Sequence, residues 1–142
     1  VLNRYPKVVE AIAELESHGY PIICKDASLG GKYPVINVTL LNPKEGTVFA
    51  SFGAHPKFQV ALERTLTELL QGRRLDQLNV FSPPSFELED VKDHLNLEAH
   101  FIDSNGLIHW NFFKKTADYE FADWNFGRET TQDEFDTLIS IF

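Results

Sequence analysis

The chain has 142 residues and a formal net charge of −8, with 43% hydrophobic and 24% charged residues. This composition is that of a globular domain, and it excludes a disordered or collagen-like chain and a membrane span, which needs ~20 consecutive apolar residues. Because phosphate binding draws on clustered Lys and Arg, the excess of acids also disfavours a nucleic-acid partner.

The length suits one domain, but neither end of the sequence resembles a natural boundary. Methionine is absent, so Val1 is not a natural start, and the last residues stop inside an apolar helical pattern. We therefore expect residues 1–142 to be a single partial domain, an internal piece of a longer protein. The lone cysteine, Cys24, excludes an intrachain disulfide, and with no signal sequence the cytoplasm is the expected location.

The first half of the sequence predicts a helix, three strands and a second helix. Apolar residues recur at helical spacing before Gly19, which is a natural stop. An Asn-Pro-Lys-Glu-Gly turn between the second and third strands is typical of a hairpin. Pro56 is expected to open the second helix, because its missing N–H costs nothing there, and Gly72 to end it. The expected ranges are 5–18 and 56–71 for the helices and 21–25, 35–41 and 47–52 for the strands.

The second half gives weaker signals. Ser85 is expected to cap a third helix after two prolines. Residues 107–114 fit a helix and a strand equally well, whereas 119–126 alternate loosely as a strand. A capping box at Thr131 precedes a final helix. The order of these elements predicts an α+β fold, with an antiparallel sheet packed with helices.

Aromatic residues crowd the second half, where acidic residues lie between them. Stacking platforms for single-stranded nucleic acid interleave aromatics with Lys and Arg instead. We therefore expect a packed aromatic core, or a buried contact with the rest of a longer chain. The residues are Phe101, Trp110, Phe112, Phe113, Tyr119, Phe121, Trp124, Phe126, Phe135 and Phe142.

One face of the second helix carries three polar groups in line. Arg64, Glu68 and Gln71 fall at i, i+4 and i+7, and Arg73 lies just past the helix. Such a row can bind an anion, position a metal through the carboxylate, or read a base edge with the amide. The competing interpretation is a solvated face with one i,i+4 ion pair, and spacing alone favours it.

The same helix resembles a motif of the YcaO family, which reads Ala-x-x-Arg-Ala-x-x-Glu-x-x-Gln-x-Arg. Thr65 replaces the usual second alanine. Shorter stretches along nearly the whole chain are also similar to the family, such as Asp-Ala-Ser-Leu-Gly-Gly at 26–31 and Asp-Trp-Asn-Phe at 123–126. The matching residues of the helix motif are Ala61, Arg64, Glu68, Gln71 and Arg73.

The resemblance implies part of an ATP- and Mg²⁺-binding domain. YcaO proteins use ATP to phosphorylate the oxygen of a peptide amide, which later leaves as phosphate. Carried onto this sequence, Arg64 meets phosphate, Glu68 serves nucleotide or Mg²⁺, and Gln71 and Arg73 support the site. These implied roles outweigh the ion-pair interpretation of the helix face.

The family's other metal-binding carboxylates belong to a Ser-x-x-x-Glu-x-x-Glu motif and a further Glu pair, which this sequence lacks. The chain alone is therefore expected to be inactive, although its full-length parent would be an ATP-utilising enzyme. The resemblance also implies a homodimer, and a peptide substrate or a radical methylthiotransferase as partner, as for an accessory factor in ribosomal protein methylthiolation. The alternative function is a non-enzymatic structural or docking module of a degenerate YcaO protein.

Overall fold

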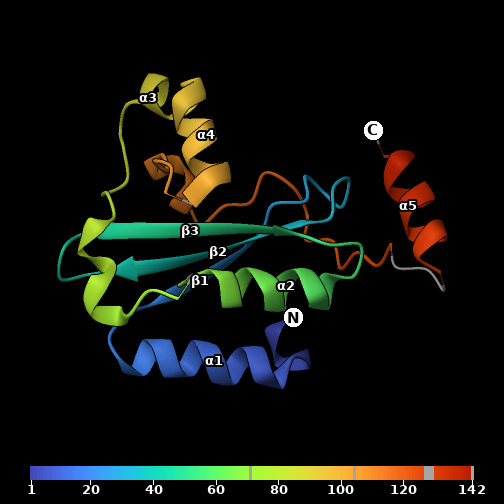
Figure 1. Ribbon diagram of the computed structural model, residues 1–142, viewed down its shortest axis with the longest axis horizontal. Helices are drawn as coiled ribbons and strands as arrows, with labels where there is room; N and C mark the ends of the chain where they lie inside the picture. The colour runs from blue at the N-terminus through green and yellow to red at the C-terminus, as the bar shows by residue number, and fades with distance from the viewer. Residues whose placement is uncertain (71, 104, 127–129, 142) are drawn as a thin grey trace.

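The computed structural model describes residues 1–70, 72–103, 105–126 and 130–141 (Figure 1). None of the helices in these ranges has the length and apolar character that crossing a membrane requires. The helices are α1 (Pro6–Ser17), α2 (Phe58–Glu68), α3 (Leu88–Lys92), α4 (His94–Asp103) and α5 (Thr131–Ile139), the strands are β1 (Ile22–Asp26), β2 (Val35–Asn42) and β3 (Thr47–Ala54), and the short 3-10 helices are η1 (Leu2–Arg4), η2 (Leu75–Val80) and η3 (Trp110–Phe113).

The three strands form one antiparallel sheet in the order β1-β2-β3. In its register Cys24 faces Val38, which in turn faces Ser51. The turn between β2 and β3 is the predicted hairpin, and Gly46 supplies its left-handed position with φ +68°. The predicted α+β fold with an antiparallel sheet is confirmed, and α1 and all three strands lie where their patterns indicated.

Helices α1 and α2 cover one face of the sheet (Figure 1). Alternate residues of β2, such as Val38 and Leu40, belong to the same buried cluster as Leu62 and Leu66 of α2. Val8 of α1 extends this cluster. Burial of these apolar side chains is the main force that holds the two helices on the sheet.

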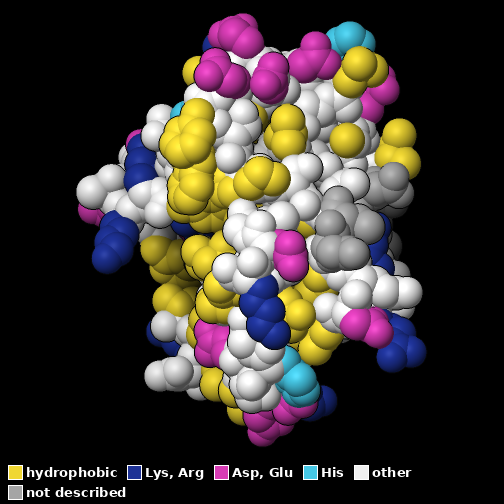
Figure 2. Space-filling model, turned by 90° about the vertical axis from the view of Figure 1, so that its left-hand side faces the viewer, with side chains coloured by type: hydrophobic (Ala, Val, Ile, Leu, Met, Phe, Trp, Pro, Cys, Tyr) yellow, Lys and Arg dark blue, Asp and Glu magenta, His cyan; other side chains and the backbone are white. Residues whose placement is uncertain are grey.

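The other face is covered by the segment that contains η3, with α3 and α4 beyond it (Figure 1). Lys25 Nζ donates a hydrogen bond to the Lys114 carbonyl at 3.0 Å and lies 5.2 Å from the centre of the Phe112 ring. Beneath this cover Asn37 and Thr39 are fully buried and hydrogen-bonded to each other, Thr39 Oγ1 donating to Asn37 Oδ1 at 2.8 Å. No described side chain of α4 is buried. Hydrophobic side chains form an exposed band on the side of the molecule that faces the viewer in Figure 2.

The boundaries predicted for α2 were wrong at both ends. Pro56 does not open the helix, because the N-cap is Lys57, which is in an extended conformation. The Pro56 carbonyl accepts a hydrogen bond from Phe126 N at 2.7 Å. The helix ends at Glu68 and not near residue 71. Gly72 still adopts the left-handed conformation that favours glycine, with φ +75°.

Ser85 does not cap α3, whose N-cap is Glu87. Ser85 instead pairs with the chain around His109, since its N–H donates to the Ile108 carbonyl at 2.9 Å and its carbonyl accepts from Trp110 N at 3.0 Å. This pairing also resolves the ambiguity of residues 107–114. They form an isolated bridge followed by η3, and so match neither a full helix nor a strand.

Residues 119–126 do not form the predicted strand. Among the described residues no strand pairs with them. Ala122 N donates to the Asp26 side chain at 3.1 Å, and Asn125 forms an isolated bridge with Lys57. The aromatic core was overpredicted as well. Trp124 is 5% exposed and packs on Phe58 with ring centres 4.8 Å apart, but most of the other second-half aromatics are half-buried or exposed. Phe142 lies outside the described residues.

The final helix, α5, is present, but its cap lies one residue earlier than predicted. The N-cap is Thr130, whose Oγ1 accepts from Asp133 N at 3.1 Å. An ion pair between Lys57 and Glu134, at 3.1 Å, links α5 to the residue before α2. No residue of α5 is buried.

Candidate functional site

The candidate site lies where α2 passes closest to β3. Gly53 permits this approach: a Cβ on it would come 3.0 Å from Thr65 Cβ and closer still to Thr65 Oγ1. Thr65 is 1% exposed, and its hydroxyl donates to the Ala61 carbonyl one helical turn earlier, at 2.6 Å. The strand and the helix are therefore in direct contact beneath the neighbouring polar side chains.

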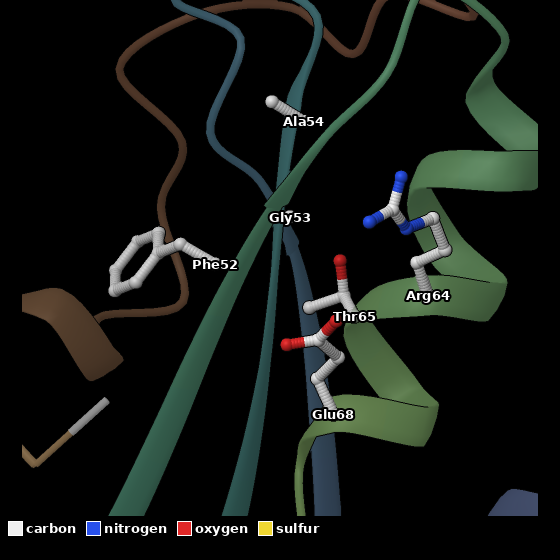
Figure 3. Close-up of a pocket in the computed structure, with 6 residues that line it drawn as sticks. All are labelled: Phe52, Gly53, Ala54, Arg64, Thr65 and Glu68. Carbon is white, nitrogen blue, oxygen red and sulfur yellow. The ribbon is translucent and has the colours of Figure 1, made fainter. Parts of the chain in front are cut away.

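Arg64 and Glu68 flank Thr65 and line one cleft of about 180 Å³ together with it. The opposite wall consists of Phe52, Gly53 and Ala54 at the end of β3. Figure 3 shows that the Arg64 guanidinium and the Glu68 carboxylate both extend from α2 toward the strand, with Thr65 between them. The i,i+4 spacing read from the sequence thus brings a cation and an anion to one cleft.

Neither charged group is paired within the described part of the chain. No ion pair within 4.0 Å joins Arg64 or Glu68 to another described side chain, and neither side chain hydrogen-bonds there. The ion pair of the competing interpretation is absent among these residues. Both groups are exposed and free to contact a ligand in the cleft.

Of the other two predicted site residues only Arg73 is described, and it does not line this cleft. Gln71 lies outside the described residues. Arg73 turns back onto the core, with its guanidinium 5.5 Å from the Phe49 ring centre and 5.7 Å from that of Phe81. Those rings are stacked 4.3 Å apart, so Arg73 packs against the edge of the sheet that holds the cleft.

The side chains that line the cleft suit a hard cation only in combination with a ligand. Among the described residues no group of three or more His, Cys, Asp or Glu side chains could hold a metal. Magnesium is commonly held by one or two carboxylates together with phosphate oxygens and water. Glu68 can supply one such carboxylate, while Arg64 can bind phosphate oxygens beside it.

A second and larger cavity adjoins the first, and no pattern in the sequence predicts it directly. It measures about 580 Å³ and shares Phe52 and Glu68 with the cleft. The remaining lining is mostly apolar and comes from α3, α4 and the segment through η3: Val91, Leu97, His100, Phe101, Leu107, Ile108, His109 and Phe112. The one available signal for the shared wall was Gly53, because a glycine inside a strand often marks a close approach of two backbones.

Cys24 has the environment of a structural thiol. It is half-buried against the core beneath α1, and burial, with a smaller contribution from Glu16, raises its pKa to about 11. The neutral thiol therefore predominates near pH 7, whereas a nucleophilic cysteine requires the thiolate.

Comparison with known proteins identifies relatives along the whole chain. Residues 1–142 match the family described as YcaO cyclodehydratase, ATP- and Mg²⁺-binding. The chain is 65% identical over all its residues to the ribosomal protein S12 methylthiotransferase accessory factor YcaO of Escherichia coli. It is also 65% identical over the same length to an uncharacterised protein of Haemophilus influenzae. The chain spans 24% of the length of each of these two relatives.

Proposed function

The chain belongs to the YcaO family, and from this membership we propose that it forms one wall of an ATP- and Mg²⁺-binding site for the phosphorylation of peptide amides. The observation that carries the proposal is the cleft in which Arg64 and Glu68, unpaired within the described part of the chain, face the end of β3. A phosphate chain carries several negative oxygens, and an exposed guanidinium in a concave site matches them in geometry and charge.

In this proposal Arg64 binds the phosphates and stabilises charge on the group being transferred. Glu68 would hold Mg²⁺, and the bound ion would neutralise part of the phosphate charge. Thr65 and Gly53 keep the two side chains at a fixed distance from β3. Arg73 acts indirectly, since its packing on Phe49 holds the chain after α2 against the sheet. Gln71 stays a proposed supporting residue.

The proposed chemistry is activation of a poor leaving group. The amide oxygen attacks the terminal phosphorus of ATP and the bond to ADP breaks, so that the oxygen carries a phosphoryl group. A nucleophile then adds to the amide carbon, and the oxygen leaves as phosphate. The residues of the chain contribute positioning and charge stabilisation, which are the main protein contributions to phosphoryl transfer.

The S12 accessory role in the name of the E. coli relative suggests the partners. We propose that the full-length protein assists a methylthiotransferase that acts on a ribosomal protein, and that it works in the cytoplasm as a homodimer. A peptide or protein segment is then the substrate whose amide is activated.

Phosphate release from ATP by the full-length protein tests the enzymatic proposal. Arg64→Ala and Glu68→Ala are each expected to lower turnover by about 10²-fold or more, because each removes a charge-stabilising group. Arg74→Ala and Glu63→Ala are the matched controls. Arg74 pairs with Asp76, Glu63 with Gln59, and neither lines the cleft.

Circular dichroism of each variant establishes that the fold is retained. The 142-residue chain alone is expected to show no turnover, since it supplies a single carboxylate to the cleft. Robust turnover by the isolated chain, or unchanged turnover in the Arg64 and Glu68 variants, would contradict the proposal. Unchanged turnover would favour the docking-module alternative.

A further inference from the structure

Among the described residues, the outer edge of β3 carries backbone groups without partners. β3 pairs with β2 on one side only, so every second residue directs its N–H and C=O outward. Val48 identifies which residues these are, since its N–H donates to the Ser82 carbonyl at 3.0 Å and not to β2. Phe52 and Ala54 follow Val48 at intervals of two residues and therefore also point outward.

The edge is open at Phe52 and Ala54. Within the described ranges the outward N–H and C=O groups of these two residues form no hydrogen bond. Both residues are exposed, Phe52 by 44%. In Figure 1 this edge runs between α2 on one side and α4 on the other.

The open edge also separates the two cavities. Gly53 faces α2 and the cleft of Arg64 and Glu68. The Phe52 side chain points to the opposite face, where its ring centre is 5.8 Å from that of His100 and 6.2 Å from that of Phe112. A strand added at this edge would place alternate side chains toward the polar cleft and toward the apolar cavity.

We propose that an extended peptide segment binds as a fourth antiparallel strand along Phe52–Ala54. This inference rests on the proposed function, because it identifies how the amide substrate reaches Arg64 and Glu68. The N–H and C=O of Phe52 and Ala54 supply hydrogen bonds that any peptide backbone can accept and donate. The peptide residue opposite Phe52 is apolar, since its side chain shares the face of Phe52 and enters the 580 Å³ cavity.

N-methylation of every second amide of a peptide tests this pairing without changing the protein. The probe is a capped, fluorescein-labelled nonapeptide in which Phe and Leu alternate with Thr and Lys, titrated into the full-length protein by fluorescence anisotropy. In an antiparallel pair, the residue opposite Phe52 directs both its side chain into the apolar cavity and its N–H toward β3. N-methylation of the apolar residues is therefore expected to weaken binding at least about tenfold, the loss of ~1.4 kcal/mol.

The isomer methylated on Thr and Lys is the matched control, because those amides point away from β3, and it is expected to bind like the unmethylated peptide. Equal affinities of the two isomers, or no saturable binding of the unmethylated peptide, would overturn the proposal. The titration contains no nucleotide, so its result is independent of whether the chain binds ATP.

Hydrogen exchange locates the bound peptide. The Phe52 and Ala54 amides are expected to exchange rapidly in the free protein and to gain protection with peptide, while Gly53, which pairs with β2, stays protected throughout. Ala54→Pro removes one outward N–H without breaking the β2–β3 ladder and is expected to weaken peptide binding, whereas Ala54→Ser is not. Protection of Phe52 and Ala54 before peptide is added would overturn the proposal, because the edge would already be covered by another copy or another segment.

Discussion

At the scale of single residues, the contact between Gly53 and Thr65 positions the cleft. Gly53→Ala is expected to lower the free energy of unfolding by about 1–3 kcal/mol, because the new Cβ would overlap the Thr65 side chain and force α2 away from β3. Urea denaturation of both proteins measures this difference.

A double variant separates this overlap from a general effect of alanine in the strand. Thr65→Ala removes Oγ1 but leaves Cβ, which would lie 3.0 Å from the new methyl group, so Gly53→Ala/Thr65→Ala is expected to recover part of the loss. If the two single effects simply add, the contact is not the cause. A Gly53→Ala protein as stable as the original would also disprove the account.

The predicted site residues show how far helical spacing can be trusted. Arg64 and Glu68 lie on one face of α2, as their spacing predicts, because both lie inside the helix, and they line the same cleft. Arg73 lies beyond Glu68, the last residue of α2, so helical phase no longer determines where its side chain points. Its contact with the Phe49 ring depends on the tertiary fold, which a local pattern does not contain.

At the scale of elements, the N-cap is an important stabilising feature of α5. It buries no side chain, and Thr130 Oγ1 accepts from Asp133 N and donates to Asp133 Oδ2 at 2.6 Å. Thr130→Ala is therefore expected to destabilise this helix by about 1 kcal/mol. Faster amide exchange within α5 would show it.

Thr131→Ala is the matched control, because the sequence predicts Thr131 as the cap and the structure assigns that role to Thr130. It is expected to change exchange in α5 by much less. A larger effect from Thr131→Ala than from Thr130→Ala would show that the cap lies at the position predicted from the sequence.

The strand predicted at 119–126 failed for a physical reason. An alternating pattern forms a strand only when another strand can pair with its backbone. Here the N–H groups of Ala122 and Phe126 donate instead to the Asp26 side chain and the Pro56 carbonyl. In contrast, β2 and β3 are joined by a short hairpin turn, so their pairing is local and could be read from the sequence.

At the scale of the whole molecule, the sheet and the layer of α1 and α2 could be predicted because their apolar residues form one core. The layer of α3, α4 and η3 could not, since it buries few side chains and is held together in part by polar contacts between its own segments. Asn96 provides an example: its side chain donates to the Leu107 carbonyl at 3.1 Å and accepts from Leu107 N at 2.6 Å. Such contacts between segments have no periodic signature, so the apolar cavity that they help to form was also missed.

The most direct test of the account is a calorimetric titration of the full-length protein with ATP and Mg²⁺. Arg64→Ala is expected to weaken binding at least about tenfold, the loss of ~1.4 kcal/mol expected for a charge-assisted phosphate contact. Glu68→Gln is expected to reduce the dependence of affinity on Mg²⁺, whereas Arg74→Ala and Glu63→Gln leave both quantities unchanged. Equal ATP affinity and equal Mg²⁺ dependence in all four variants and the original protein would contradict the assignment of the cleft as the nucleotide site.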